Sequence, residues 1–386
     1  MKPILAESFI VLQIIGLWKP EKNVSPCYNW FYNLRMCLIF FFIYSFTING
    51  FIGLIISSKS ISDLSNDCFI LLSILAICGK IVNIVNSRQQ IIEIIKVLDC
   101  EPCKPRNKDE ELIQIKVDRI IRFNTLFYGI LTEITAFMVT VGTLLQRLPI
   151  GVLPYNTYIP WDYSKGSLYW LAYIYQIISV GFSANSDIGY DTLIPGLMMQ
   201  ISAKVQILKY RFLNLVNSIE STQGDKYYLK SLKLERKIIA DSVKCHLVIF
   251  KLAETINSTF SSVIFLQFII SSIVLCISVY NMARMPLFST EFTTIVLYLC
   301  CMLTEIFILC AAGNEVTLVS RTVSDAIYHM DWMSLDSTTV KSLIIIMNRS
   351  LRPIKFISGN LVVLSYDSFK ALIKTSYSAF NVLQQT

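Results

Sequence analysis

Charged residues are scarce in this sequence of 386 residues. Asp, Glu, Lys and Arg together make up 16%, against roughly 25% in an ordinary soluble domain. Hydrophobic residues make up 54%, so too few polar side chains remain to cover the surface of a water-soluble chain. The same composition excludes intrinsic disorder, a coiled coil and a secreted disulfide scaffold. The sequence therefore predicts an all-α membrane protein with several spans.

Histidine is almost absent, since only His246 and His329 occur, and this excludes a histidine-rich metal centre. The sequence also lacks a glycine-rich phosphate loop, a Ser/His/Asp set and a pair of catalytic carboxylates. We therefore expect a protein that is not an enzyme and that needs no cofactor or metal. Cys100 and Cys103 have no second cysteine pair or histidine nearby, which favours a structural role over zinc or redox chemistry.

Apolar runs long enough to cross a bilayer, which takes about 20 residues in a helix, occur seven times. They cover residues 34–57, 69–86, 124–145, 168–190, 260–280, 292–312 and 356–383. The last run is the most polar of the seven. An earlier apolar run at 9–18 is too short to span, and we expect it to lie in the membrane interface with Trp18 as an anchor.

The basic residues set the predicted orientation. Twenty-seven of the 34 Lys and Arg residues fall in the amino-terminal segment and in the inner loops 88–122, 204–251 and 321–355, whereas four fall on the other side. Because the side rich in Lys and Arg faces the cytoplasm, we expect an inverted topology. The amino terminus is then cytoplasmic and, after seven crossings, the carboxyl terminus is extracellular.

Helical spacing of apolar residues recurs in the inner loops, at 190–219, 229–250 and 339–349. We expect the fourth helix to continue past a kink at Pro195-Gly196, and helices 4–7 to extend into a cytoplasmic anchor. The alternative is that these segments are membrane-surface helices that bind anionic lipid through their lysines.

Ionisable residues inside spans are functional candidates, because each costs about 2.5–3.5 kcal/mol at the centre of an inserted helix. They are Lys80, Glu133, Asp187, Glu305, Asp367, Lys370 and Lys374. Asp367 and Lys370 are spaced to pair on one helix face. The seventh segment is too polar to face lipid, so it should line water or be enclosed by other helices at the bundle centre.

Several stretches resemble the insect odorant receptor family and run through most of the chain. The moderate matches are IIGLW at 14–18, DTL at 191–193, QILKYR at 206–211, GNEV at 313–316 and AIY at 326–328 with Trp332. The most specific match is MNRSLRP at 347–353 with the sequence that follows through SYSAF at 376–380. The chain lacks the long inner-loop insertion of the family's co-receptor, so it resembles a tuning subunit.

The resemblance implies an odorant-gated, non-selective cation channel in the plasma membrane of an olfactory neuron. In that family, tuning subunits and a common co-receptor form a tetramer whose seventh helices line one central pore. The cytoplasmic helices form the anchor between subunits. The expected partners are co-receptor subunits, a small volatile organic ligand, the lipid bilayer and permeant cations, but no nucleic acid.

Three sets of candidate site residues follow. A ligand arriving from outside should bind in the outer half of the bundle, near Leu72, Phe137, Thr140, Leu144, Tyr173, Gln176, Ile177, Tyr280 and Tyr298. The predicted pore face of the seventh helix carries Ile373, Tyr377, Phe380, Asn381 and Gln384, with Phe380 as the apolar constriction and a face through Val382 as the alternative. The predicted contact between subunits uses Val340, Leu343, Ile344 and Met347.

The expected division of the chain follows from these assignments. It consists of a cytoplasmic amino-terminal segment with a short interfacial helix (1–33), transmembrane helices 1–4 with the ligand pocket (34–190), a cytoplasmic helical extension (191–259), transmembrane helices 5 and 6 (260–312), a cytoplasmic anchor helix (313–355) and the pore-lining helix 7 with an extracellular carboxyl terminus (356–386).

Three alternatives remain open at the level of sequence. The first is a gustatory-type ligand-gated cation channel of the same superfamily, whose seventh helix begins with Thr-Tyr and ends with Gln-Phe. Here Ser376 separates Thr375 from Tyr377, and Gln385 follows Gln384, which favours the odorant branch. A secondary transporter is less favoured because the spans show no inverted repeat. A G-protein-coupled receptor is disfavoured by the inverted topology.

Overall fold

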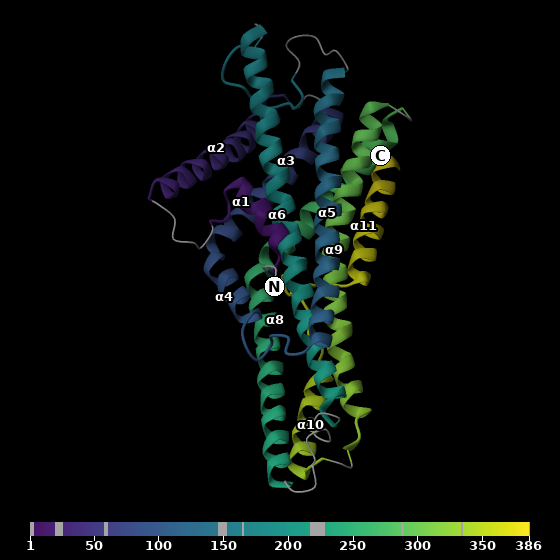
Figure 1. Ribbon diagram of the computed structural model, residues 1–386. Helices are drawn as coiled ribbons and strands as arrows, with labels where there is room; N and C mark the ends of the chain where they lie inside the picture. The colour runs from purple at the N-terminus through teal and green to yellow at the C-terminus, as the bar shows by residue number, and fades with distance from the viewer. Residues whose placement is uncertain are drawn as a thin grey trace.

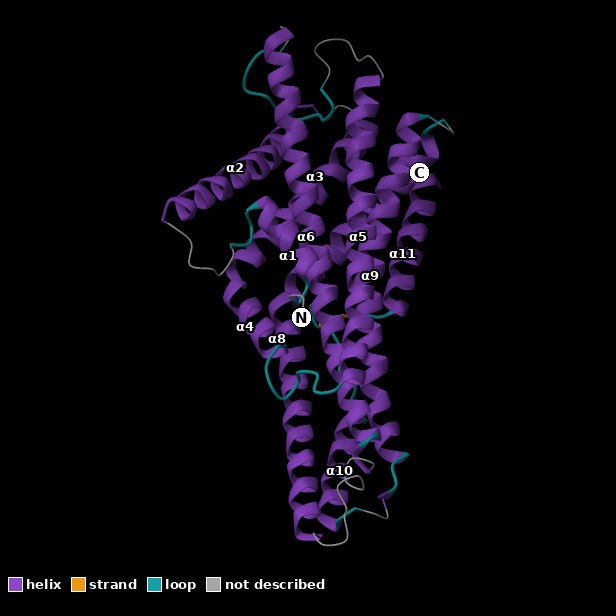
Figure 2. Cartoon of the chain, viewed as in Figure 1, coloured by secondary structure: helices purple, strands orange, loops and turns teal. Residues whose placement is uncertain are grey.

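The computed structural model describes residues 4–19, 26–57, 61–145, 153–163, 166–216, 228–286, 289–332 and 335–385. Helix dominates these residues, and the long helices run side by side along one axis (Figures 1 and 2). The elements in chain order are α1 (Ala6–Ile15), α2 (Pro26–Ser57), α3 (Ile61–Asn86), α4 (Arg88–Leu98), α5 (Lys108–Leu145), α6 (Gly166–Leu213), α8 (Tyr228–Arg284), α9 (Thr290–Tyr328), α10 (Ser337–Ser350), β1 (Ile357–Ser358), β2 (Val362–Val363) and α11 (Tyr366–Gln385).

Three helices continue far beyond the apolar runs from which they were predicted. α6 has 48 residues, α8 has 57 and α9 has 39. At 1.5 Å per residue, α8 is about 85 Å long, nearly three times the roughly 30 Å hydrocarbon core of a bilayer. The predicted continuation of the fourth span through Pro195 is confirmed, since α6 is helical as far as Leu213. The long helices therefore form one continuous bundle with two chemically different halves.

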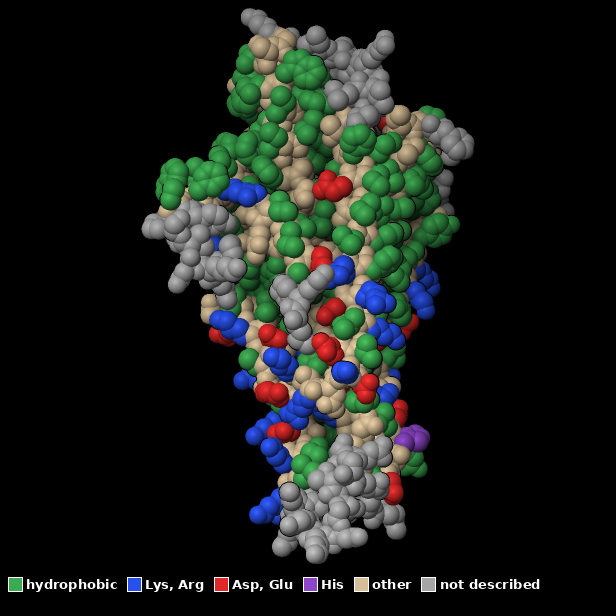
Figure 3. Space-filling model, in the orientation of Figure 1, with side chains coloured by type: hydrophobic (Ala, Val, Ile, Leu, Met, Phe, Trp, Pro, Cys, Tyr) green, Lys and Arg blue, Asp and Glu red, His purple; other side chains and the backbone are tan. Residues whose placement is uncertain are grey.

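The two halves are visible on the surface. Figure 3 shows hydrophobic side chains over most of the upper half of the molecule and charged side chains gathered on the lower half. The carboxyl end of α11 lies in the apolar half, whereas α10 lies at the charged end (Figure 1). A surface divided in this way is the one expected when only one half is surrounded by lipid.

Membrane-spanning helices are present. By length and mean hydropathy, three segments of the described residues could each cross a membrane: Asn29–Ile56, Leu232–Arg284 and Thr290–Tyr328. Ile70–Asn86 and Arg88–Leu98, bent by 65° at their junction, add a fourth if the pair is one span. The remaining long helices fall below this criterion. The seven-crossing inverted topology therefore stays a prediction.

The inner loop expected at 88–122 is largely helical, which corrects the sequence analysis. Ile91, Ile94 and Leu98 of α4 are buried and form one apolar face of this helix. The surrounding sequence is charged, which hid this face from the sequence analysis. α5 already begins at Lys108, and three acidic residues in its first turn suit the positive end of the helix dipole. The third long helix therefore also extends toward the charged half, together with the fourth to sixth.

The short amino-terminal helix packs against protein rather than lying freely in the interface as expected. Leu12 and Ile15 of α1 are buried, and the hydroxyl of Ser8 pairs with that of Thr192 on α6 at 2.9 Å. Trp18 is only 6% exposed, and the Arg88 guanidinium lies 5.3 Å from its ring centre. The ring of Trp18 therefore lies inside the protein, whereas the position of α1 at the membrane interface stays a prediction.

The seventh helix begins ten residues later than the predicted run at 356. Residues 357–363 form a two-stranded antiparallel hairpin in which Ile357 pairs with Val363. Gly359 and Asn360 adopt left-handed conformations, with φ of 57° and 58°, which turn the chain between the strands. Phe356 and Leu364, on either side of the hairpin, are buried, whereas Leu361 within it is 75% exposed. In this segment, helical structure is confined to α11.

Candidate functional site

A cavity of about 260 Å³ lies inside the apolar half of the bundle, lined by α3, α5, α6, α8 and α9 and by Pro154 and Tyr155 after α5. Apolar side chains such as Ile74, Val139 and Ile295 form much of its wall. Scaled from the roughly 150 Å³ cavity that holds benzene, this space suits a ligand of about ten non-hydrogen atoms. Its position between helices is typical of small-molecule sites.

Most hydroxyl groups on the cavity wall are already bonded within the protein. Thr132, Thr135 and Ser183 each donate to a carbonyl four residues earlier, at 2.8–2.9 Å. The hydroxyls of Ser73 and Tyr298 pair with each other across α3 and α9. These groups therefore offer little hydrogen-bonding capacity, and this part of the wall behaves as an apolar surface.

Four ionisable side chains meet at the inner end of the cavity and form what we term the Lys80 cluster: Lys80, Asp187, Asp191 and Glu305. The ammonium of Lys80 lies 2.7 Å from Asp187 Oδ1, 2.6 Å from Asp191 Oδ2 and 2.7 Å from Glu305 Oε1. The cluster joins α3 to α6 and α9 across the bundle. Lys80, Asp187 and Glu305 also line the cavity.

Two neutral groups also donate hydrogen bonds to the cluster. The Tyr128 hydroxyl of α5 donates to Asp187 Oδ2 at 2.9 Å. The Gln267 amide of α8 donates to Glu305 Oε1. Residues from all five helices that enclose the cavity therefore meet at this point. A ligand that changed the packing here would act on every one of these helices.

The ammonium of Lys80 occupies the centre of the cluster, so the three carboxylates do not form an open metal site. Carboxylate oxygens of Asp187, Asp191 and Glu305 lie within 4.8 Å of one another, a spacing that a metal ion could use. The ammonium of Lys80 lies among them, however, and offsets one of their negative charges. The side chains of Lys80, Asp191 and Glu305 are 3–4% exposed, so each depends on the others for its stability in the interior.

Of the nine predicted ligand-contacting residues, Tyr298 lines this cavity. Phe137 is 64% exposed and lies on the outside of the bundle. Tyr173 and Gln176 are buried, but their polar groups hold other parts of the chain. Tyr173 donates to the Thr140 carbonyl, and Gln176 bonds to Tyr155 and Thr157 of the loop that follows α5.

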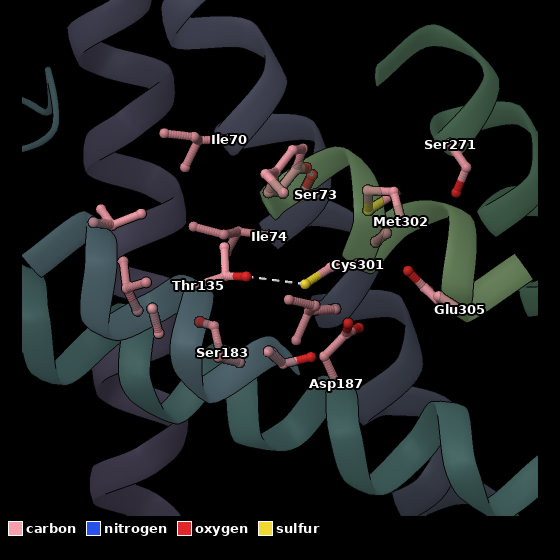
Figure 4. Close-up of a pocket in the computed structure, with 18 of the residues that line it drawn as sticks. Ile70, Ser73, Ile74, Thr135, Ser183, Asp187, Ser271, Cys301, Met302 and Glu305 are labelled. Carbon is pink, nitrogen blue, oxygen red and sulfur yellow. Dashed lines mark hydrogen bonds between the residues drawn. The ribbon is translucent and has the colours of Figure 1, made fainter. Parts of the chain in front are cut away.

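The other predicted ligand residues do not border the cavity either. Leu72, Ile177 and Tyr280 are half-buried and absent from its lining, and the side chain of Leu144 lies outside the described residues. These nine residues were predicted from their expected distance to the outer membrane surface. A better signal was available in the intramembrane charges, because Lys80, Asp187 and Glu305 all line the cavity. Figure 4 shows Asp187 and Glu305 there.

Some side chains of the predicted pore face of α11 are described, and in the single chain these are exposed or half-buried. Ile373 is 41% and Tyr377 60% exposed, whereas Phe380 and Asn381 are half-buried. The side chain of Gln384 lies outside the described residues, as does that of Val382 on the alternative face. The opposite face, with Leu372 and Ser376, is buried, and the Ser376 hydroxyl approaches the Ser272 carbonyl of α8 at 3.4 Å.

Asp367 and Lys370 pair at 3.8 Å, as their spacing predicts. The two side chains are 94% and 76% exposed, respectively. A surface pair of this kind contributes little to stability. Its carboxylate and ammonium are therefore available to water at the start of α11.

The predicted subunit-contact face of α10 is divided between the interior and the surface. Leu343 is fully buried within its own chain, and Val340 and Met347 are half-buried. Ile344 is 48% exposed and its neighbour Ile345 is 70% exposed. The helix therefore offers a partner the side that carries Ile344 and Ile345, because the Leu343 side already packs inside the protomer.

The interior side of α10 joins α8 near His246. The Arg349 guanidinium lies 3.9 Å from the ring centre of Phe250, and the Phe250 ring contacts the His246 imidazole at 4.8 Å. Burial, with the nearby charge of Arg349, lowers the pKa of His246 to about 4. The histidine is therefore neutral near pH 7 and acts as a packing residue.

The comparisons with known proteins agree on one family. The model of the 7tm Odorant receptor family matches residues 60–377. Odorant receptor 46a, isoform A, of Drosophila melanogaster is 28% identical over 327 residues, covering 84% of this chain and 83% of that protein. Odorant receptor Or1 of Anopheles gambiae is 22% identical and covers 97% and 93% of the two chains.

The fold matches a solved receptor. The structure of the insect olfactory receptor OR5 from Machilis hrabei in complex with eugenol has a TM-score of 0.85, with 19% sequence identity over 98% of this chain and 96% of that one. The family model covers well over half of the sequence, and the curated relatives align along most of their length. By this evidence the chain belongs to the odorant receptor family, whose members are receptors and not enzymes.

Proposed function

We propose that this chain is the tuning subunit of an odorant-gated, non-selective cation channel in the plasma membrane of an olfactory neuron. A volatile ligand binds in the cavity at the Lys80 cluster, and the pore lies between the α11 helices of four subunits, some of them co-receptors. The observation that carries this proposal is a cavity inside the apolar half whose wall joins five helices.

A packed route leads from the cavity to α11. Glu305 lies on the cavity wall, and Phe307 follows two residues later on α9. The ring of Phe307 lies 6.0 Å from that of Tyr366 and 5.5 Å from that of Phe369, in the first turn of α11. A shift of α9 on ligand binding would therefore reach the base of the pore helix directly.

In this proposal the seven helices cross the membrane with the amino terminus inside. The charged ends of α6, α8 and α9 form, with α10, the cytoplasmic anchor between subunits. The exposed residues Ile344 and Ile345 support a contact there, because large apolar side chains exposed on a helix favour burial against a partner.

We expect odorant-evoked cation current when this chain is expressed together with the co-receptor, including when G-protein signalling is blocked. Ala184→Phe should reduce sensitivity about tenfold or more, because Ala184 lines the cavity and the larger ring fills it. The measurement is the concentration–response curve of the current to a panel of volatile compounds.

The matched control is Ile178→Phe on the same helix, where the side chain is already 37% exposed and does not border the cavity. Sensitivity should stay as in the unsubstituted receptor. A current that disappears when G-protein signalling is blocked would reject the channel proposal. Equal sensitivity in the two variants would place the ligand elsewhere in the bundle.

Cysteine substitution tests the pore face of α11. We expect Tyr377→Cys and Phe380→Cys to react with a water-soluble thiol reagent applied outside, faster during odorant stimulation, and the reaction to change the conductance. Ser376→Cys is the control, because Ser376 is 5% exposed and faces α8, so it should stay unmodified. Block at position 382 without reaction at 380 and 384 would assign the pore to the alternative face.

A further inference from the structure

We propose that the cavity selects ligands that carry a protonated amine on a compact apolar body, with the ammonium bound on the cavity side of the Asp187 and Glu305 carboxylates. This inference rests on the proposed function, since it takes the cavity as the odorant site, and it adds the chemical class of the odorant. It is carried by three observations: the shape of the cavity, the charge at its inner end and one unpaired hydroxyl.

The cavity is apolar along its length and charged at one end. Side chains such as Ile70, Ile74 and Met302 surround the part that would take the ligand's hydrocarbon, while Asp187 and Glu305 lie together at the other end (Figure 4). The space of about 260 Å³ suits a molecule of about ten non-hydrogen atoms. An amphiphile with one polar head matches this division.

Negative charge exceeds positive charge at the inner end. Lys80 is the ammonium within reach of the three carboxylates, and its three hydrogens are already directed at Asp187, Asp191 and Glu305. The other polar groups that face the cluster, Tyr128 and Gln267, are neutral. A cationic head group would offset part of the excess carboxylate charge in a site of low dielectric, whereas an anionic one would add to it.

Acceptor capacity also exceeds the donors present. Each ionised carboxylate offers about four acceptor positions. Against these, the described residues supply the three hydrogens of Lys80, the Tyr128 hydroxyl and the Gln267 amide. An ammonium brings three further donors without needing an acceptor of its own.

Ser271 marks the place of the head group. This residue of α8 is 1% exposed and lines the cavity, and its hydroxyl has no hydrogen-bond partner among the described residues. Figure 4 shows Ser271 on the same side of the cavity as Glu305, with its oxygen turned inward. A buried hydroxyl without a partner is costly, so a ligand donor or acceptor placed there would satisfy it.

The test compares ligands of equal shape that differ in the head group. Binding of 2-phenylethylamine, 2-phenylethanol and phenylacetic acid is measured by calorimetry on the purified full-length chain in lipid nanodiscs. Hexylamine and hexan-1-ol give the same amine-against-alcohol comparison with a linear alkyl chain. We expect each amine to bind about tenfold or more tightly than its alcohol, as charge-assisted hydrogen bonds require, and the acid to bind least.

Two substitutions assign the preference to the site. Glu305→Gln should remove most of the amine-over-alcohol preference, and Ser271→Ala, which leaves the Lys80 cluster intact, should weaken amine binding about threefold or more. Glu133→Gln is the matched control, because Glu133 is exposed on α5 and does not border the cavity. The Glu133→Gln variant should prefer amines over alcohols as strongly as the unsubstituted chain does.

The outcomes separate this inference from the proposed function. Alcohols that bind as tightly as amines, or an amine preference that survives Glu305→Gln, would overturn the inference. Current evoked by neutral ligands without amine binding would overturn it while leaving the channel proposal in place. Amine binding that depends on Glu305 and evokes no current with the co-receptor would support the inference and reject the channel proposal.

Discussion

Lys80→Met is expected to abolish production of folded receptor. The substitution keeps the length of the side chain but removes the ammonium that three buried carboxylates share at 2.6–2.7 Å. Removing one partner from a buried ion pair costs about 3–5 kcal/mol, and here three carboxylates lose the same partner. Total stabilities of about 5–15 kcal/mol leave little room for such a loss. The measurement is the yield of monodisperse receptor by size-exclusion chromatography.

Lys251→Met is the matched control, because Lys251 is exposed on α8 and the same chemical change there removes no buried partner. Its yield should equal that of the unsubstituted chain. A partial rescue of Lys80→Met by Asp191→Asn is expected as well, since the second change removes one of the charges left without a partner. Normal yield of Lys80→Met alone would show that the carboxylates are not ionised together in the folded receptor.

Gly313→Val is expected to uncouple α9 from the base of α11. A Cβ atom at Gly313 would lie 2.6 Å from Leu364 Cβ and 2.8 Å from the Leu364 carbonyl oxygen, closer than atoms can approach. The backbone of Leu364 is itself held, because its N–H donates to the Phe356 carbonyl at 2.9 Å. Overpacking of this kind costs about 1–3 kcal/mol or more. We expect loss of odorant-evoked current and a lower melting temperature.

Gly181→Val on α6 is the control, since a Cβ there meets nothing within 4 Å. Both variants carry the same intrinsic penalty for valine in a helix, so the difference between them reports the contact with Leu364 alone. Equal melting temperatures and equal currents would show that α9 and the segment before α11 can separate without consequence for gating.

The wrong expectations of the sequence analysis share one cause. The run at 356–383 reads as one apolar segment, yet Phe356 and Leu364 are core residues on either side of a hairpin that turns at Gly359. Hydropathy indicates how much apolar surface must be kept from water, but it does not distinguish burial in lipid from burial in protein. The same ambiguity affected Trp18 and Leu343, which the chain buries in its own interior.

By itself, the sequence determined the class of the protein, its helical content, its membership of the odorant receptor family and the residues whose charges lie in the apolar half. These properties follow from composition, from the helical spacing of apolar residues and from short motifs, all of which depend on residues close together in the chain. Only the tertiary structure decided which charges meet. Lys80 and Glu305 are 225 positions apart, and a distance of 2.7 Å between them depends on how α3 and α9 pack. The cavity likewise forms between five helices. Its position and size depend on how these helices pack, which the sequence of a single helix does not determine.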